Sequence, residues 1–202
     1  MAFLPRRLPP INTGDYRADS GHLYSSYFFA SGATVLREYD MFTTATGSIG
    51  QGYTGSLTET ETNLLNANRN ADQFSWVITD IGVMFNSDII LGDIQGFLNN
   101  ASVVFRKPGY ERNLGRTDFF AAGGGLWGVT TMNAAQSWTN GHPSPQSRRK
   151  LKREIIINPG ETFKFSLKLA NARASGGAAL TLTNNCEARV DLYGYFAQEI
   201  VV

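Results

Sequence analysis

The chain has 202 residues, of which 42% are hydrophobic and 12% aromatic, and this composition excludes a wholly disordered protein. The 18 Lys and Arg residues nearly balance the 17 Asp and Glu residues, so any binding of an acidic partner depends on a local cluster of bases. The 21 glycines favour a turn-rich β protein, and the low charged fraction of 17% leaves much uncharged polar surface to face other subunits.

Residues 1–21 contain three of the seven prolines and the adjacent Arg6 and Arg7, with no hydrophobic periodicity. We predict that they form an extended arm lying on the body or on a neighbouring subunit. Residues 22–202 then form one domain, which is an ordinary size for a β-sandwich. The start has no apolar core of a secretory signal, and no apolar run is long enough for a membrane helix, so we expect a protein made and used without export.

The next segment is rich in aromatic and β-branched residues from 24 to 39, which predicts one or two strands broken at Ser31-Gly32. Residues 43–55 are mostly Thr, Gly and Ser and predict a long loop. Within this loop, residues 50–55 have the GxGxxG spacing of a dinucleotide-binding turn. The flanking residues lack the strand and helix that such a site requires, so we interpret the glycines as part of a flexible loop.

A short helix is predicted for residues 56–68, because Ser56 and Glu59 have the spacing of a capping box. Leu57, Leu64 and Leu65 add a partial apolar stripe to this segment.

Residues 74–85 give the strongest strand pattern of the first half of the chain. Val77, Thr79, Ile81, Val83 and Phe85 share one face, and Trp76, Ile78 and Met84 lie on the other. We therefore expect a central strand, or one buried by a partner, that is covered at least partly on both faces. Residues 101–106 predict a shorter strand ending at the turn Lys107-Pro108-Gly109. Residues 89–97 have mixed spacing, and the glycines and prolines of 113–147 predict a long connection between sheets.

The last third of the chain is the most regular. The apolar run Ile155–Ile157 meets the turn Asn158-Pro159-Gly160, after which apolar residues alternate with Lys and Ser from 163 to 169. A second alternating stretch places Cys186, Ala188, Val190 and Leu192 on one face, so we expect Cys186 to be a buried, unreactive thiol. These patterns predict an all-β sandwich of two antiparallel layers.

Candidate catalytic and metal-binding residues are few. The two histidines, His22 and His142, are not paired and sit near turn residues, and Cys186 is the one cysteine. Glu59 and Glu61 flank Thr60 in a polar stretch that is typical of a wet surface. We therefore predict no catalytic residues, no metal site and no cofactor. A hydrolase remains open only if the fold brings two carboxylates together in a cleft.

The strongest charge feature is a run of five bases in six residues: Arg148, Arg149, Lys150, Lys152 and Arg153 surround Leu151, just before the apolar strand. Such a run can bind the phosphates of a nucleic acid or an anionic lipid surface. A solvated loop or an ion-pair patch between subunits is an equally good interpretation. Arg6 and Arg7 would join the cluster if the arm folds back.

Four segments together resemble the single jelly-roll virion proteins of tailless icosahedral bacteriophages. They are Phe74-Ser-Trp-Val-Ile-Thr-Asp-Ile81, Ala121-Ala-Gly-Gly-Gly-Leu-Trp-Gly128, Ile155-Ile-Ile-Asn-Pro-Gly-Glu-Thr-Phe163 and Val190-Asp-Leu-Tyr-Gly-Tyr-Phe196, and the likeness covers roughly residues 74–197. The resemblance implies a single jelly-roll β-sandwich of about eight antiparallel strands, with long loops, an extended N-terminal arm and at most one or two short helices.

The resemblance also implies a function. We expect a structural capsid protein, not an enzyme, that is made in the host cytoplasm and assembles into oligomeric capsomers of an icosahedral shell. Its partners would be copies of itself and other virion proteins, with an anionic membrane or packaged nucleic acid at the basic run, and no small-molecule substrate. The alternative is a carbohydrate- or receptor-binding module of a phage spike or fibre. That alternative depends on Tyr53, Tyr110, Trp127 and Trp138, which lie in predicted loops where they could stack on sugars.

Overall fold

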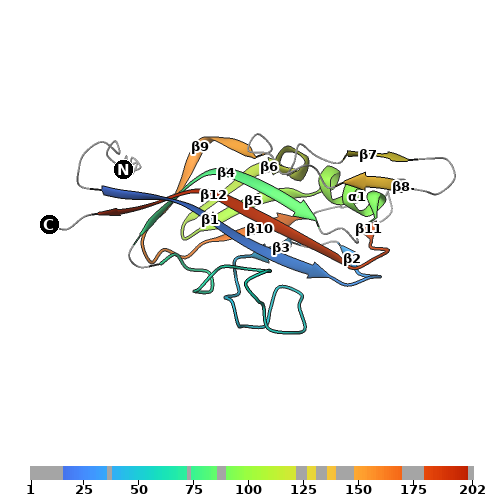
Figure 1. Ribbon diagram of the computed structural model, residues 1–202, viewed down its shortest axis with the longest axis horizontal. Helices are drawn as coiled ribbons and strands as arrows, with labels where there is room; N and C mark the ends of the chain where they lie inside the picture. Colours follow the sequence, from blue (N-terminus) through green and yellow to red (C-terminus); the bar gives the residue numbers. More distant parts are fainter. Residues whose placement is uncertain are drawn as a thin grey trace.

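The fold is that of a computed structural model, shown in Figure 1. The structure describes residues 16–35, 38–71, 74–85, 90–121, 127–130, 136–139, 148–169 and 180–199. The strands are β1 (Tyr16–Phe29), β2 (Thr34–Val35), β3 (Glu38–Met41), β4 (Ser75–Phe85), β5 (Ser102–Lys107), β6 (Tyr110–Arg116), β7 (Trp127–Thr130), β8 (Gln136–Thr139), β9 (Arg149–Ile157), β10 (Lys164–Lys168), β11 (Leu180–Thr181) and β12 (Cys186–Glu199). One α-helix, α1 (Leu91–Asn100), and one 3₁₀ turn, η1 (Thr117–Phe120), complete the described elements.

Eight of these strands form two four-stranded antiparallel sheets, in the orders β1-β12-β4-β9 and β3-β10-β5-β6. If these eight strands are counted in chain order, the first (β1) pairs with the eighth (β12) and the second (β3) with the seventh (β10). The third (β4) pairs with the sixth (β9), and the fourth (β5) with the fifth (β6). Two short pairs, β2 with β11 and β7 with β8, stand apart from these sheets. The predicted all-β antiparallel sandwich is therefore confirmed.

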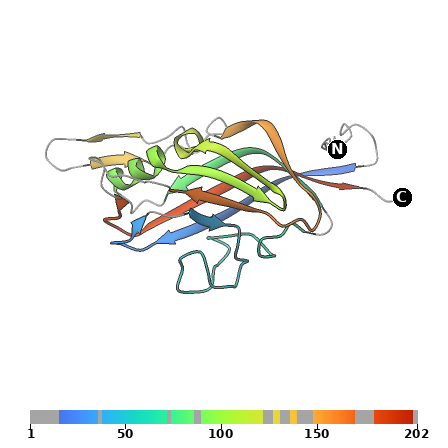
Figure 2. The same cartoon turned by 180° about the vertical axis from the view of Figure 1, so that it is seen from behind.

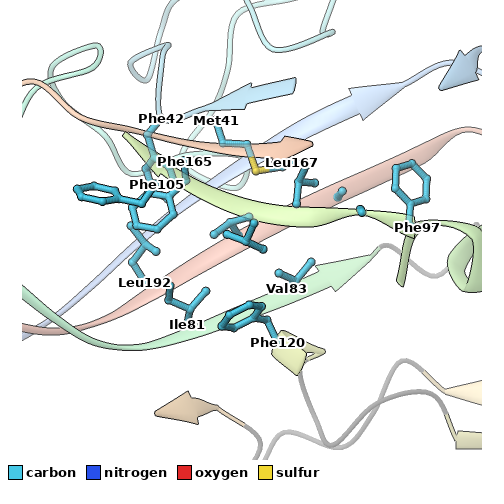
Figure 3. Close-up of a cluster of buried hydrophobic side chains, with 14 of the residues drawn as sticks. Met41, Phe42, Ile81, Val83, Phe97, Phe105, Phe120, Phe165, Leu167 and Leu192 are labelled. Atoms are coloured by element: carbon cyan, nitrogen blue, oxygen red, sulfur yellow. The ribbon is translucent and has the colours of Figure 1, made fainter. Parts of the chain in front are cut away.

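The hydrophobic core lies between the two sheets (Figure 3). Ile81, Val83 and Leu192 project from one sheet toward Phe105 and Phe165 of the other, and all five are at most 1% exposed. The predicted alternation of residues 163–169 holds, because the apolar side chains are buried and Lys164 and Lys168 are not. The inward row of Cys186, Ala188, Val190 and Leu192 is also confirmed.

Strand β4 lies in the interior of its sheet, as predicted, but the predicted division of its faces is wrong. The pairing of β4 with both neighbours shifts at Thr79, between Ile78 and Asp80. This β-bulge reverses the alternation, so Trp76 and Ile78 share the core with Ile81, Val83 and Phe85. Val77 faces outward, where its ladder neighbours are Tyr195 and Ile156, and is fully buried there. Both faces of β4 are thus covered along part of its length, as expected.

The long segment from 42 to 71 is a loop that covers the free edge of β1 (Figures 1 and 2). Backbone amides of Ser26 and Phe28 donate to the carbonyls of Glu61 and Gln51 at 2.8 and 2.9 Å. The predicted helix over 56–68 is wrong, because these residues form turns and bridges along the β1 edge. In the turn at 59–61, Glu61 accepts from the Thr58 amide at 2.6 Å. Covering a strand edge in this way prevents pairing with another chain.

The glycines of the GxGxxG stretch have a packing role. Gly52 has a positive φ of 84°, and a side chain there would collide with the backbone of Phe28. Gln51 turns inward, where its side-chain oxygen accepts from the amides of Thr43 and Thr44 at 3.2 Å. The stretch therefore belongs to a loop, as predicted, and packs this loop against β1. It does not form a strand-to-helix turn.

The side of the sandwich opposite this loop carries β9 and β6, with α1 and η1 near one end (Figure 2). Helix α1 covers most of the 89–97 segment with mixed spacing and buries Ile94, Phe97 and Leu98. The strand ending at Lys107-Pro108-Gly109 is confirmed, and Gly109 adopts a φ of 69° in the turn. Strand β6 was not predicted, and it occupies the start of the expected connection 113–147. Residues 16–21 of the expected arm belong to β1, and 1–15 lie outside the described residues.

Candidate interaction surface on the outer face of one sheet

The outer face of the β1-β12-β4-β9 sheet carries a polar and aromatic cluster. On β12 the residues that alternate with the core row are Arg189, Asp191 and Tyr193, and their neighbours on β1 are Tyr24 and His22. Asp191 is fully buried although it faces away from the core. A carboxylate in such a position needs polar partners, because removal from water disfavours its charge.

Two side chains supply these partners. His22 Nε2 lies 2.9 Å from Asp191 Oδ1, and Arg189 Nε lies 3.3 Å from the same carboxylate. Arg189 also places its guanidinium 5.4 Å from the ring centre of Tyr24. The outer face therefore holds a charged group that its own neighbours satisfy.

Tyr193 links this cluster to the start of β9. Its ring is parallel to that of His22 at 4.5 Å, and the guanidinium of Arg148 lies 3.7 Å from the ring centre. The pKa of Tyr193 is raised above its ordinary value by burial and by the charge of Asp191. The charges of Arg148 and Arg189 offset only part of this increase. Gly82 of β4 lies beside Asp191 in the ladder and presents no side chain, which leaves room for Arg148 to cross β4.

The covering loop fixes the β1 side of the cluster. Asn63 donates from Nδ2 to the carbonyl of His22 at 2.7 Å and accepts from the amide of Tyr24 at 2.9 Å. The Tyr24 hydroxyl donates to the carbonyl of Glu59. The sequence predicts His22 beside turn residues and does not reveal this cluster, because His22 and Asp191 are 169 positions apart.

The predicted basic run forms the exposed first half of β9, and not a segment before the strand. The strand is an edge of its sheet, and its ladder with β4 pairs Lys150 with Asp80 and Arg149 with Ile81. Leu151 packs against the core, and Arg149 lies 5.7 Å from the ring centre of Phe119. Within the described part of the chain, Lys150, Lys152 and Arg153 are exposed and form no ion pair. Arg6 and Arg7 lie outside the described residues.

The outer face of the other sheet is different, because its charges neutralise one another. Arg106 pairs with Glu38 and with Glu111, the second at 2.8 Å. Lys164 Nζ lies 2.6 Å from Asp40, which also accepts from the hydroxyl of Ser166. This network lies across the middle of the sheet and leaves little free charge there.

The remaining candidates do not form a reactive site with the residues described. Glu61 bonds to Thr58 and Thr60, and Glu59 is exposed, so this acid pair belongs to the loop turn. The Cys186 thiol is fully buried, as expected. Among the residues whose placement is described, no three His, Cys, Asp or Glu side chains are grouped for a metal ion. His142 and the side chains of Trp127 and Trp138 lie outside the described residues.

An open recess of about 450 Å³ lies beside the β5–β6 turn, with Arg106, Lys107, Pro108 and Phe163 among its lining residues. Tyr110, at the start of β6, is 46% exposed, whereas Tyr53 is half-buried against Phe28 with ring centres 5.6 Å apart. Of the aromatic residues considered for sugar stacking, Tyr110 is thus the accessible one among those described.

In the described part of the chain, no helix combines the length and the apolar character needed to cross a membrane. No protein-family model matches the sequence, and no curated protein matches it.

Proposed function

We propose that the chain is a structural capsid protein whose sandwich is a single jelly roll and whose copies assemble into the capsomers of an icosahedral viral shell. The strand order carries the proposal. The eight strands of the two sheets pair as in one long hairpin, from the pair of first and last strands (β1 with β12) to the pair at the tip (β5 with β6). This hairpin is folded into two facing sheets. Jelly rolls built in this way are typical of viral capsid domains.

The outer face of the β1-β12-β4-β9 sheet supports self-association. It presents Tyr24, Tyr193 and Tyr195 together with Arg148 and Arg189, all on one side of the sheet. Tyrosine and arginine are enriched at the centres of protein interfaces. The side chains are held by Asp191 and by one another, so little conformational entropy remains to be lost on association.

The test is the mass of the purified protein by light scattering, backed by electron micrographs of the material. An assembling subunit gives species several times heavier than 22.1 kDa, and closed particles would support a shell directly. Tyr195→Ala removes an aromatic group from the outer face and should shift the distribution toward single chains. Tyr110→Ala, at the turn beside the other sheet, is the matched control. A protein that stays monomeric at every ionic strength refutes the proposal.

The recess beside Tyr110 favours a second candidate, a carbohydrate- or receptor-binding module. An exposed aromatic ring next to a recess lined by polar side chains suits a sugar, whose apolar face stacks on the ring. A glycan array separates the two candidates, because Tyr110→Ala would abolish sugar binding while leaving assembly unchanged. An array without hits removes this candidate.

A further inference from the structure

The first half of β9 concentrates positive charge that the chain does not neutralise. Five other described bases have carboxylate partners: Arg106, Lys107, Arg116, Lys164 and Arg189 each form an ion pair. Lys150, Lys152 and Arg153 are exposed, and none of them pairs with a described carboxylate. The acids nearest in sequence and register are Asp80, which accepts from its neighbour Thr79, and Glu154. The strand therefore has an excess of bases that a partner of opposite charge can use.

A second copy of this chain is a poor source of that opposite charge. Six of its described carboxylates are already engaged in ion pairs: Glu38, Asp40, Glu111, Asp118, Glu161 and Asp191. Three more, Glu61, Asp80 and Asp93, accept hydrogen bonds within the chain. Within the described residues, only Glu59 and Glu154 have neither a hydrogen bond nor an ion pair through their side chains, and Glu154 lies on β9 itself. The complement of the basic strand is therefore a different polyanion.

The geometry of the strand suits a chain of phosphates. Side chains two positions apart in a strand lie about 6.8 Å apart on one face, which is close to the distance between successive phosphates along an extended nucleic-acid strand. Lys150 and Lys152 have this spacing on β9. Phe119 is 57% exposed beside Arg149 and offers a ring on which a base can stack.

A lipid surface fits less well. The apolar residue within the basic run is Leu151, and it packs against the core. The run itself therefore presents charge without an apolar side chain that could enter the acyl region, and the exposed Phe119 beside it is a single ring.

We infer that the first half of β9 is a nucleic-acid-binding strand. It holds the phosphate backbone along its free edge, with Lys150 and Lys152 on the outer face and Arg149 and Arg153 on the other side of the strand, and it stacks a base on Phe119. Binding depends on phosphates and not on base sequence. The inference rests on the proposed function only where it names the packaged genome as the natural ligand. The binding of a nucleic acid depends on the side chains of β9 and Phe119, and not on the formation of a shell.

The experiment titrates a fluorescent oligothymidylate of about 30 nucleotides, a length that spans a typical single-strand site, with the full-length protein over a range of salt. Four phosphate contacts give a slope of about −2.8 in log K against log salt, so affinity falls about fiftyfold between roughly 50 and 200 mM. Lys152→Gln should make the slope shallower by about 0.7, and the double change Lys150→Gln with Lys152→Gln by about 1.4. Phe119→Leu should weaken binding by about fivefold to a hundredfold at every salt concentration.

Lys168→Gln is the matched control, because Lys168 is an exposed lysine on the outer face of the other sheet, and it should leave the slope unchanged. Vesicles rich in phosphatidylglycerol are titrated in parallel. The inference is overturned if the oligonucleotide does not bind at low salt, if Lys168→Gln has the same effect as Lys152→Gln, or if the vesicles bind and the oligonucleotide does not. Light scattering on the same samples tests the shell proposal separately, since a monomer could still bind the oligonucleotide.

Discussion

The substitution Gly194→Ala tests how closely β12 and β4, the two longest interior strands, are packed. Gly194 lies on β12 opposite Ile78 of β4, at the point where the register of the pair shifts. A Cβ at this position would lie 2.9 Å from the carbonyl carbon of Val77 and 3.1 Å from Cα of Ile78, and closer still to the Val77 oxygen. Ordinary carbon contacts are about 3.5–4.0 Å, so β12 and β4 would have to separate.

The expected cost of Gly194→Ala follows from that separation. Overpacking in a filled interior costs about 1–3 kcal/mol, and each ladder hydrogen bond that is weakened adds about 0.5–1.5 kcal/mol. We therefore expect a loss of about 2–5 kcal/mol, which is a large part of the roughly 5–15 kcal/mol that stabilises a typical domain.

Urea unfolding measures this loss through tryptophan fluorescence, because Trp76 is fully buried beside Phe196, with ring centres 4.2 Å apart. With a slope of about 2 kcal/mol per molar, the midpoint should fall by about 1–2.5 M. Gly92→Ala is the control, since nothing lies within 4 Å of the added Cβ on α1, and it should stabilise by about 0.5–1 kcal/mol. A Gly194→Ala midpoint equal to that of the unsubstituted protein would refute the steric argument.

Three further outcomes are expected. Removing residues 1–15 should leave the urea midpoint unchanged. Removing residues 1–21 should lower it, because this deletion also removes the part of β1 that pairs with β12 from Tyr16–Glu199 to Gly21–Gly194. Equal midpoints for the two deletions would contradict the β1 pairing. Burial, with Asp93 and Glu187 adding to it, raises the pKa of the Cys186 thiol, so maleimide should label the protein at neutral pH only after unfolding, and fast labelling of the native state would disprove this. Burial raises the pKa of Glu61, but hydrogen bonds from Thr58 and Thr60 outweigh it and bring the pKa below its ordinary value of 4.5. The lowered pKa of Glu61 stabilises the fold above pH 4.5, and this stabilisation is lost as the pH falls through the pKa of Glu61 in the folded protein. Glu61→Gln should therefore weaken the fall of the melting temperature with decreasing pH in the acid range. An unchanged dependence on pH would count against these bonds.

The strands that follow a strict period of two could be predicted from the sequence. Phe163 to Leu169 and Cys186 to Leu192 alternate because one face of each strand packs on the core and the other does not. The faces of β4 could not be predicted in the same way, because the bulge at Thr79 inserts a residue that a period of two does not anticipate. Strand β6 has few apolar residues and is largely exposed, so its pairing with β5 left little pattern in the sequence.

The candidate surface was predictable in composition and not in arrangement. The five bases from Arg148 to Arg153 are visible in the sequence, but their place on a free strand edge depends on the ladder with β4. The predicted helix over 56–68 failed because Leu57 and Leu64 are buried in a loop where their backbones bond to residues 46–48, and not along a helical stripe. Asp191 and His22 meet only when the first and last described strands pair.

That pairing also determines when the molecule can fold. Strand β12 comes last among the described elements, yet it lies between β1 and β4 in the sheet. A ribosome must therefore release the chain through Glu199 before this sheet can be completed, and until then β1 and β4 each lack a neighbour. Contacts between such distant segments close slowly, because the chain loses the entropy of a very long loop. This sheet should thus be completed only after β12 has left the ribosome, so that chaperones would meet the earlier strands as open sheets.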